Sequence, residues 1–174
     1  LKIRSLMSDL RQLIEEWLVV DHLRKDRLKS RLVLSSIYRQ RKLEKNFQSS
    51  IKKTETLLAN HPLRNQHFYE LQLELHEIKM AHDSVSKRTE DLYFQEISEN
   101  TDVNFLIRKL KNACSLITHQ SVYKTQYEFG LLHSFIDRLE TTEYMNIPAV
   151  AIYYYCFRFL KEKESMAYFV KFKN

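Results

Sequence analysis

Hydrophobic residues recur every three or four positions along most of this chain, with polar residues between them. Such series cover the opening segment, about residues 27–40 and 41–60, and a segment around residues 68–78. This spacing places the hydrophobic side chains on one side of a helix, so each segment is predicted to be an amphipathic helix. The series in the opening segment consists of Leu6, Leu10, Leu13, Trp17 and Val20.

The middle of the chain shows the same spacing with interruptions. A short helix is predicted around residues 92–97. The polar run SENTD, residues 98–102, is predicted to be a connection, because Ser, Asn and Asp favour helix caps over helix interiors. A strong helix is predicted over about residues 103–117, and the polar pair at 120–121 separates it from another helix over about residues 129–139.

The stretch NIPAVAIYYYCFRFL, residues 146–160, has two interpretations. Its Val, Ile, Tyr and Phe residues favour a strand, but a strand needs a pairing partner and no other segment offers one. Pro148 suits the first turn of a helix, where its missing N–H costs nothing, and Asn146 precedes it as a candidate cap. We therefore predict a helix here.

The three consecutive tyrosines of this predicted helix also have two interpretations. Because each helical residue turns about 100°, Tyr153, Tyr154 and Tyr155 fan out over about 200° and do not share one face. They either fill gaps in the core with their rings, or one or two of them line a groove. We treat all three as candidate partner-binding residues.

The composition indicates an all-α fold of about eight or nine helices. The chain has one Gly and two Pro in 174 residues, which leaves few positions for the tight turns of hairpins. Predicted helix pairs begin near residues 27, 66, 103 and 148. Pairs that recur in this way favour stacked helical hairpins, an α-solenoid, because a lone hairpin does not bury both of its hydrophobic faces. A plain helical bundle is the alternative.

Two stretches resemble the tetratricopeptide repeat. In SSIYRQRKLEKNFQSSIKKTETLLANHP, Tyr38 and Pro62 stand where that repeat has an aromatic residue and a closing proline, and YEFGLLHSFIDRLE is followed by Pro148. The chain, especially ACSLITHQSVY and IPAVAIYYYCF, is also similar to a group of uncharacterised bacterial helical proteins. The resemblance implies a superhelix of helix pairs and the binding of a protein or peptide.

Known catalytic motifs are missing from the sequence. A single glycine, Gly130, excludes the glycine-rich phosphate loops and the nucleophile elbow. The stretch HEIKM has methionine where a zinc helix needs its second histidine. We therefore expect no enzymatic activity, no metal and no cofactor. Cys114 and Cys156 lie within hydrophobic helical patterns, so we expect reduced thiols and a cytoplasmic protein.

Positive charge gathers in the first third of the chain. Residues 1–60 hold 14 basic and 7 acidic residues, whereas the whole chain has a net charge of +6. Within residues 24–53, eleven basic residues face only two acidic ones, and such a surface attracts phosphates or an acidic partner. The candidate binding residues here are Arg39, Arg41, Lys42 and Lys45.

The leading hypothesis is therefore a non-catalytic helical-repeat module, spanning residues 1–174 as one domain, that binds a protein or peptide. The alternative is nucleic-acid binding through residues 24–53. No hydrophobic run reaches the ~18 residues needed to span a bilayer. Because aromatic residues crowd residues 164–174 without a stop signal, we also expect the array to continue past Asn174, and that segment is a candidate for self-association.

Overall fold

The computed structural model describes residues 2–86, 93–162, 167, 168 and 170. None of these residues forms a strand, which confirms the predicted all-α class. The described ranges hold seven α-helices and one short 3₁₀ helix, so the prediction of eight or nine helices was too high. The elements are α1 Lys2–Lys25, α2 Arg27–Gln40, α3 Glu44–Ala59, α4 Gln66–Ser86, α5 Phe94–Tyr123, α6 Leu132–Leu139, η1 Glu143–Asn146 and α7 Pro148–Lys161.

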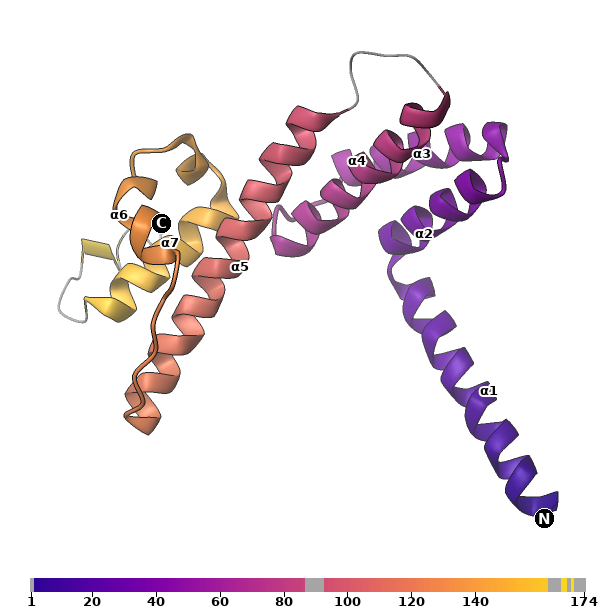
Figure 1. The fold of residues 1–174 in the computed structure, drawn as a ribbon, viewed down its shortest axis with the longest axis horizontal. Helices are drawn as coiled ribbons and strands as arrows, with labels where there is room; N and C mark the ends of the chain where they lie inside the picture. The colour runs from indigo at the N-terminus through magenta and orange to yellow at the C-terminus, as the bar shows by residue number, and fades with distance from the viewer. Residues whose placement is uncertain (1, 87–92, 163–166, 169, 171–174) are drawn as a thin grey trace.

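Two hydrophobic cores hold these helices together (Figure 1). Helices α2, α3 and α4 enclose the first core, and α5, α6 and α7 enclose the second. Tyr69 on α4 contacts both cores, and α4 packs against α5, so the two groups of helices adjoin. The first core buries Leu28, Leu32, Phe47, Ile51, Leu58, Phe68, Leu71, Leu75 and Ile78. The second buries Val103, Leu106, Ile107, Leu110, Ala113, Ile117, Leu132, Ile136, Leu139, Ala149, Val150, Tyr154 and Phe157.

Helix α1 extends away from both cores, with the N-terminus at its far end (Figure 1). Its end packs against α2, and every residue from 3 to 20 is exposed. Asp26 separates the two helices and caps α2, because its carboxylate accepts a hydrogen bond of 2.9 Å from the Lys29 backbone N–H. The predicted helices over 27–40 and 41–60 correspond to α2 and α3.

The predicted connection at residues 98–102 is wrong, because α5 runs through it without a break. The cap-forming side chains bond within the helix instead. Thr101 Oγ1 donates to the Ile97 carbonyl at 2.7 Å, and Asn100 Nδ2 donates to the Glu96 carbonyl at 2.7 Å. Such bonds to the preceding turn let polar residues continue a helix. Asn100 is also buried against α4, where it lies 3.2 Å from His76 Nδ1.

The predicted separation at residues 120–121 is also wrong by a few residues. Helix α5 continues to Tyr123 and ends where Lys124 takes a left-handed conformation, with φ of 53°. Residues 124–131 then form the connection to α6 and include Gly130, whose φ of 56° is favoured in glycine. Phe129, which we placed in a helix, lies in this connection.

The stretch NIPAVAIYYYCFRFL forms helix α7, as predicted, and Pro148 occupies its first turn. Asn146 does not cap this helix. It belongs to η1, and Ile147, whose side chain makes no capping bond, precedes the first turn. Most of residues 164–174 lie outside the described residues, so the expectation of self-association through this segment stays a prediction.

Candidate interaction surfaces

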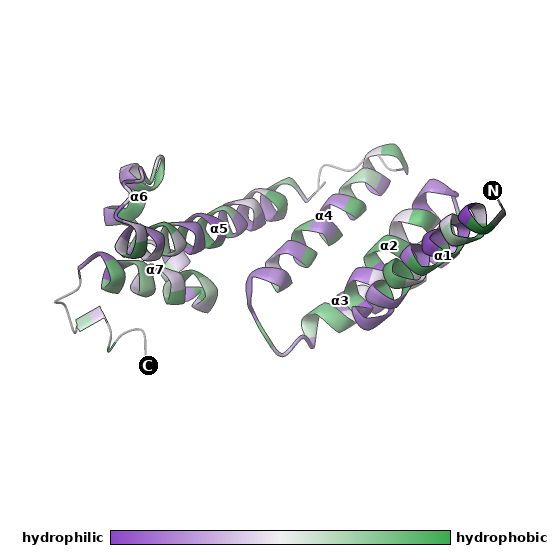
Figure 2. Ribbon diagram, turned by 90° about the horizontal axis from the view of Figure 1, so that it is seen from below, coloured by the Kyte–Doolittle hydropathy of each residue, from purple (hydrophilic) through white to green (hydrophobic). Residues whose placement is uncertain are grey.

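Ten large hydrophobic side chains of α1 are exposed, with exposed fractions from 45% at Val20 to 76% at Ile3. Nine of them lie within an arc of about 160°, since each residue turns about 100° around the helix. Hydrophobic residues, in green, recur along α1 in Figure 2. We call these nine residues the α1 stripe: Ile3, Leu6, Met7, Leu10, Leu13, Ile14, Trp17, Leu18 and Val20.

The α1 stripe is the strongest candidate interaction surface in the described structure. Monomeric proteins rarely expose a contiguous hydrophobic patch larger than a few hundred Å². Sequence reasoning found the helical series in this segment but assigned no binding role to it. One signal was available, because the segment precedes the first predicted helix pair at residue 27 and therefore has no partner helix within the array.

Charged residues of opposite sign flank the α1 stripe. Asp9 and Glu16 lie about 100° to 120° from Leu10 on one side, and Arg4 and Arg11 lie at the same angles on the other. All four residues are exposed. Glu15 lies beyond the two arginines, about 140° from Leu10, and forms an ion pair of 2.8 Å with Arg11. The stripe therefore has one acidic edge and one edge lined by arginines, of which Arg11 is paired within its own helix.

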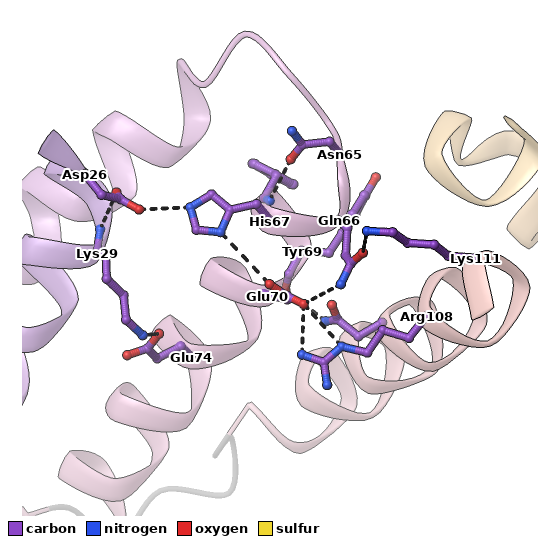
Figure 3. Close-up of polar contacts among 12 residues, drawn as sticks. Asp26, Lys29, Asn65, Gln66, His67, Tyr69, Glu70, Glu74, Arg108 and Lys111 are labelled. Carbon is purple, nitrogen blue, oxygen red and sulfur yellow. Dashed lines mark hydrogen bonds and ion pairs between the residues drawn. The ribbon is translucent and has the colours of Figure 1, made fainter. Parts of the chain in front are cut away.

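A second surface is an open groove of about 700 Å³ between α4 and α5, with Lys29 of α2 at its border. Four of its charged residues form two pairs, Lys29 with Glu74 and Arg108 with Glu70 (Figure 3). Glu70 of α4 accepts hydrogen bonds of 2.8 Å from both Arg108 Nη2 and Gln66 Nε2, and Lys29 Nζ lies 2.6 Å from a Glu74 carboxylate oxygen. Burial opposes ionisation of Glu70, but these hydrogen bonds outweigh it and lower its pKa.

The same network continues to the start of α2. His67 Nε2 lies 3.0 Å from Asp26 Oδ2, while the other oxygen of Asp26 caps α2 (Figure 3). Burial disfavours the charged carboxylate, yet the hydrogen bonds from Lys29 and His67 lower the pKa of Asp26. The network fastens α2, α4 and α5 to one another, which explains these charges without any ligand.

The three tyrosines of α7 differ in burial, as their fan-out predicts. Tyr154 is fully buried, and its hydroxyl donates to Glu140 Oε2 at 3.2 Å and accepts from Arg158 Nε at 3.0 Å. A buried, bonded Tyr154 does not reach a partner, so this candidate site residue is a core residue. Tyr153 and Tyr155 are half-buried, and Tyr153 lines an open hollow of about 440 Å³ beside the α3–α4 connection.

The four basic candidates gather where α2 turns into α3. Arg41, Lys42 and Lys45 are exposed, and Arg39 is half-buried. Arg39 and Lys42 line a hollow of about 380 Å³, and within the described structure the buried Nε of Arg39 has no hydrogen-bond partner. This corner therefore presents a concentrated positive charge to a partner.

His82 of α4 also lines this hollow and is buried. Its ring stacks on Phe47 at 4.2 Å and lies 2.9 Å from Glu44 Oε2 and 2.8 Å from Asp83 Oδ1. Burial disfavours the charged imidazole, but the two carboxylates outweigh it and raise the pKa of His82. Folding therefore shifts the protonation equilibrium of His82 toward the charged imidazolium.

We expect the stability contribution of His82 to depend on pH. A histidine whose pKa is raised by folding stabilises the fold below its unfolded pKa of about 6.5, and this contribution is lost as pH rises through the folded pKa. His82→Gln should therefore lower the free energy of unfolding more at pH 6 than at pH 8, as measured by urea unfolding. An exposed histidine of α6 supplies the matched control, His133→Gln. An equal loss at both pH values would show that the imidazolium does not contribute.

Cys114 of α5 and Cys156 of α7 are free and half-buried, as the predicted reduced thiols require. Burial and the neighbouring Cys156 raise the pKa of Cys114 to about 12, and its Sγ lies 3.7 Å from the Tyr153 carbonyl oxygen. A thiol with this pKa stays protonated at neutral pH and is a weak nucleophile.

Among the residues that the structure describes, no three His, Cys, Asp or Glu side chains come together in a way that could hold a metal ion. None of the described helices has the length and hydrophobicity needed to cross a membrane. No protein-family model, curated protein or solved structure matches the chain. The resemblance to tetratricopeptide repeats therefore stays a prediction.

Proposed function

We propose that this chain is a non-catalytic helical interaction module that binds a protein partner through the α1 stripe. The exposure of nine large hydrophobic side chains on one helix supports the proposal most directly. Burying a side chain of this size stabilises a complex by about 1.5 to 3 kcal/mol, so a matching surface gains a large driving force from this helix. Most of that gain is offset by the entropy of association.

The remaining helices act in this proposal as the scaffold that carries α1. Helices α2 and α3 form a hairpin, α4 packs on α2, and α4 pairs with α5. This order of contacts supports stacked helix pairs of the tetratricopeptide kind. The length of α5 and the shortness of α6 give any such array irregular units. The free thiols fit a reducing compartment such as the cytoplasm.

The alternative function, nucleic-acid binding, draws support from the exposed basic corner of Arg41, Lys42 and Lys45. Phosphate binding releases counterions and therefore weakens steeply as salt rises, whereas binding through hydrophobic surface does not. Salt dependence thus separates the two functions.

Affinity capture with the tagged chain tests both functions. At low and high salt, with and without nuclease treatment, we expect the wild-type chain to retain a defined protein, which mass spectrometry identifies and whose purified form binds directly. Leu10→Glu should abolish this binding because it places a charge in the centre of the stripe. Ser8→Glu lies on the opposite side of the same helix and should leave binding unchanged.

Reversing the charges of Arg39, Arg41, Lys42 and Lys45 should not affect the capture of that protein. Nanomolar binding to random duplex that this reversal and high salt both abolish would instead establish the nucleic-acid alternative. Equal capture by the wild-type chain and Leu10→Glu would contradict a role for the α1 stripe.

A further inference from the structure

We propose that the α1 stripe binds the α1 stripe of a second copy of this chain, with the two helices parallel. This inference rests on the proposed function and names the partner of the same surface. Three observations carry it: the size of the stripe, the position of α1 relative to the cores, and the opposite charges along the two edges of the stripe.

The stripe is large enough for a stable interface. Its nine side chains are about half exposed or more. If each loses about 80 Å² of accessible surface when neighbouring helices cover the whole stripe, roughly 700 Å² per chain is buried, close to the ~800 Å² per partner of a standard specific interface. The stripe also spans a wider arc than a two-helix seam needs, so it accommodates more than one neighbouring helix.

The chain's own cores do not cover the stripe. Helix α1 points away from both cores (Figure 1). Residues 3–20 are all exposed. Asp21, which follows the stripe, is tied to Lys25 by an ion pair of 2.6 Å near the junction with α2. A second α1 offers a matching surface of equal length and width, because it carries the same stripe.

The charges along the edges favour a parallel pair of identical helices. In a parallel pair, the acidic edge of one helix, with Asp9 and Glu16, faces the basic edge of its neighbour, with Arg4 and Arg11. In an antiparallel pair, acidic edge faces acidic edge and basic faces basic, which costs free energy on both sides. The edges of two such helices therefore match better in the parallel orientation.

The same charges disfavour a membrane surface as the occupant. Helices that lie on membranes carry Lys and Arg on their polar face, where they meet anionic lipid. Over its whole length α1 has five basic residues against four acidic ones: Lys2, Arg4, Arg11, Arg24 and Lys25 against Asp9, Glu15, Glu16 and Asp21. This near balance lacks the basic polar face that attracts anionic lipid, so a second protein helix is the better match.

Sedimentation equilibrium of the full chain, from micromolar to hundreds of micromolar concentration, tests self-association. We expect dimers or larger assemblies of the wild-type chain. Leu10→Glu should raise the dissociation constant by at least ~30-fold, since central interface side chains carry most of the binding free energy. Ser8→Glu, on the outer side of α1, should leave it within about threefold. The single tryptophan, Trp17, should shift its fluorescence to shorter wavelength as the wild-type chain associates.

Charge exchange tests the edges. A chain with Asp9→Lys and Glu16→Lys has two basic edges, and a chain with Arg4→Glu and Arg11→Glu has two acidic edges. We expect each to associate more weakly than the wild-type chain, and the mixture to form a heteromeric assembly. Variants that associate as well as the wild-type chain would overturn the role of the edges.

Cysteine cross-linking tests the orientation. With Cys114→Ser and Cys156→Ser in the background, Leu6→Cys should form a covalent dimer in oxidised glutathione, because thiol–disulfide exchange joins two equivalent sulfurs and releases reduced glutathione. Ser8→Cys, on the outer side, is the control. No cross-link at position 6 in a chain that still self-associates would overturn the parallel orientation.

A wild-type chain that stays monomeric at every concentration would overturn self-association. If Leu10→Glu then still abolished capture of a different protein, the proposed function would stand and only this inference would fail. A monomeric chain whose Trp17 fluorescence shifts on phosphatidylglycerol vesicles, but not in Leu10→Glu, would assign the stripe to a membrane surface instead.

Discussion

Leu110→Ala is expected to lower the free energy of unfolding by about 2 to 5 kcal/mol, as large-to-small changes in packed cores do. Leu110 lies in the middle of α5 with no exposed surface, and it packs with the side chains of α6 and α7 in the second core. The loss combines the missing transfer free energy of the side chain with the cavity that it leaves. Urea unfolding followed by circular dichroism measures it.

Two further leucine and phenylalanine sites calibrate this result. Leu63 lies in the α3–α4 connection and is 58% exposed. Leu63→Ala should therefore lower the free energy of unfolding by less than ~0.5 kcal/mol. Phe129 is half-buried in the connection before α6, and its ring meets that of Phe157 edge-on with the centroids 5.6 Å apart. Phe129→Ala should therefore lower the free energy of unfolding by less than Leu110→Ala does. A loss at Leu110 as small as that at Leu63 would show that the assignment of the second core is wrong.

Hydrophobic spacing was a reliable guide to which segments are helices. The series in residues 27–40, 41–60 and 68–78 corresponds to α2, α3 and α4. Most leucines of these series line the first core, whereas Leu43 is exposed just before α3. Residues 149–160 were placed in a helix by other arguments, namely the position of Pro148 and the lack of a pairing partner for a strand. In α2, α3 and α4, local spacing and the burial of one face favour the same structure.

Helix ends were predicted less well, because cap-forming residues have more than one use. The run at residues 98–102 has the composition of a connection, but Thr101 bonds to the preceding turn, and Asn100 bonds both there and to α4. The choice depends on whether a neighbouring helix offers a partner for such side chains. That information lies in the packing of α5 against α4 and not in the local sequence.

The surfaces themselves could be predicted only in part. Tyr154 was a candidate for partner binding, but Glu140 and Arg158 satisfy its hydroxyl within the core. The polar groove pairs Glu70 with Arg108, which is 38 residues away in the chain. Contacts between residues so far apart depend on how the helices stack. The spacing of residues within one helix does not predict that stacking.

For the α1 stripe, the sequence identifies the hydrophobic side of the helix but not its role. Periodicity predicts which side of a helix is hydrophobic, and α1 is accordingly a regular helix. Periodicity does not tell what covers that side, because a core helix and an exposed docking helix carry the same pattern. Only the position of α1 outside both cores distinguishes the two roles.

Leu32→Ala is the second substitution with a large expected effect, about 2 to 5 kcal/mol, because Leu32 is fully buried in the first core. Comparing it with Leu110→Ala tests whether the two cores form one domain. Tyr69 contacts both cores, and the groove network ties α2 and α4 to α5. We therefore expect one cooperative transition, in which either substitution lowers the protection of both cores in hydrogen exchange. Loss of protection confined to α2, α3 and α4 in Leu32→Ala would instead show that the chain comprises two independently folding units, contradicting a single domain.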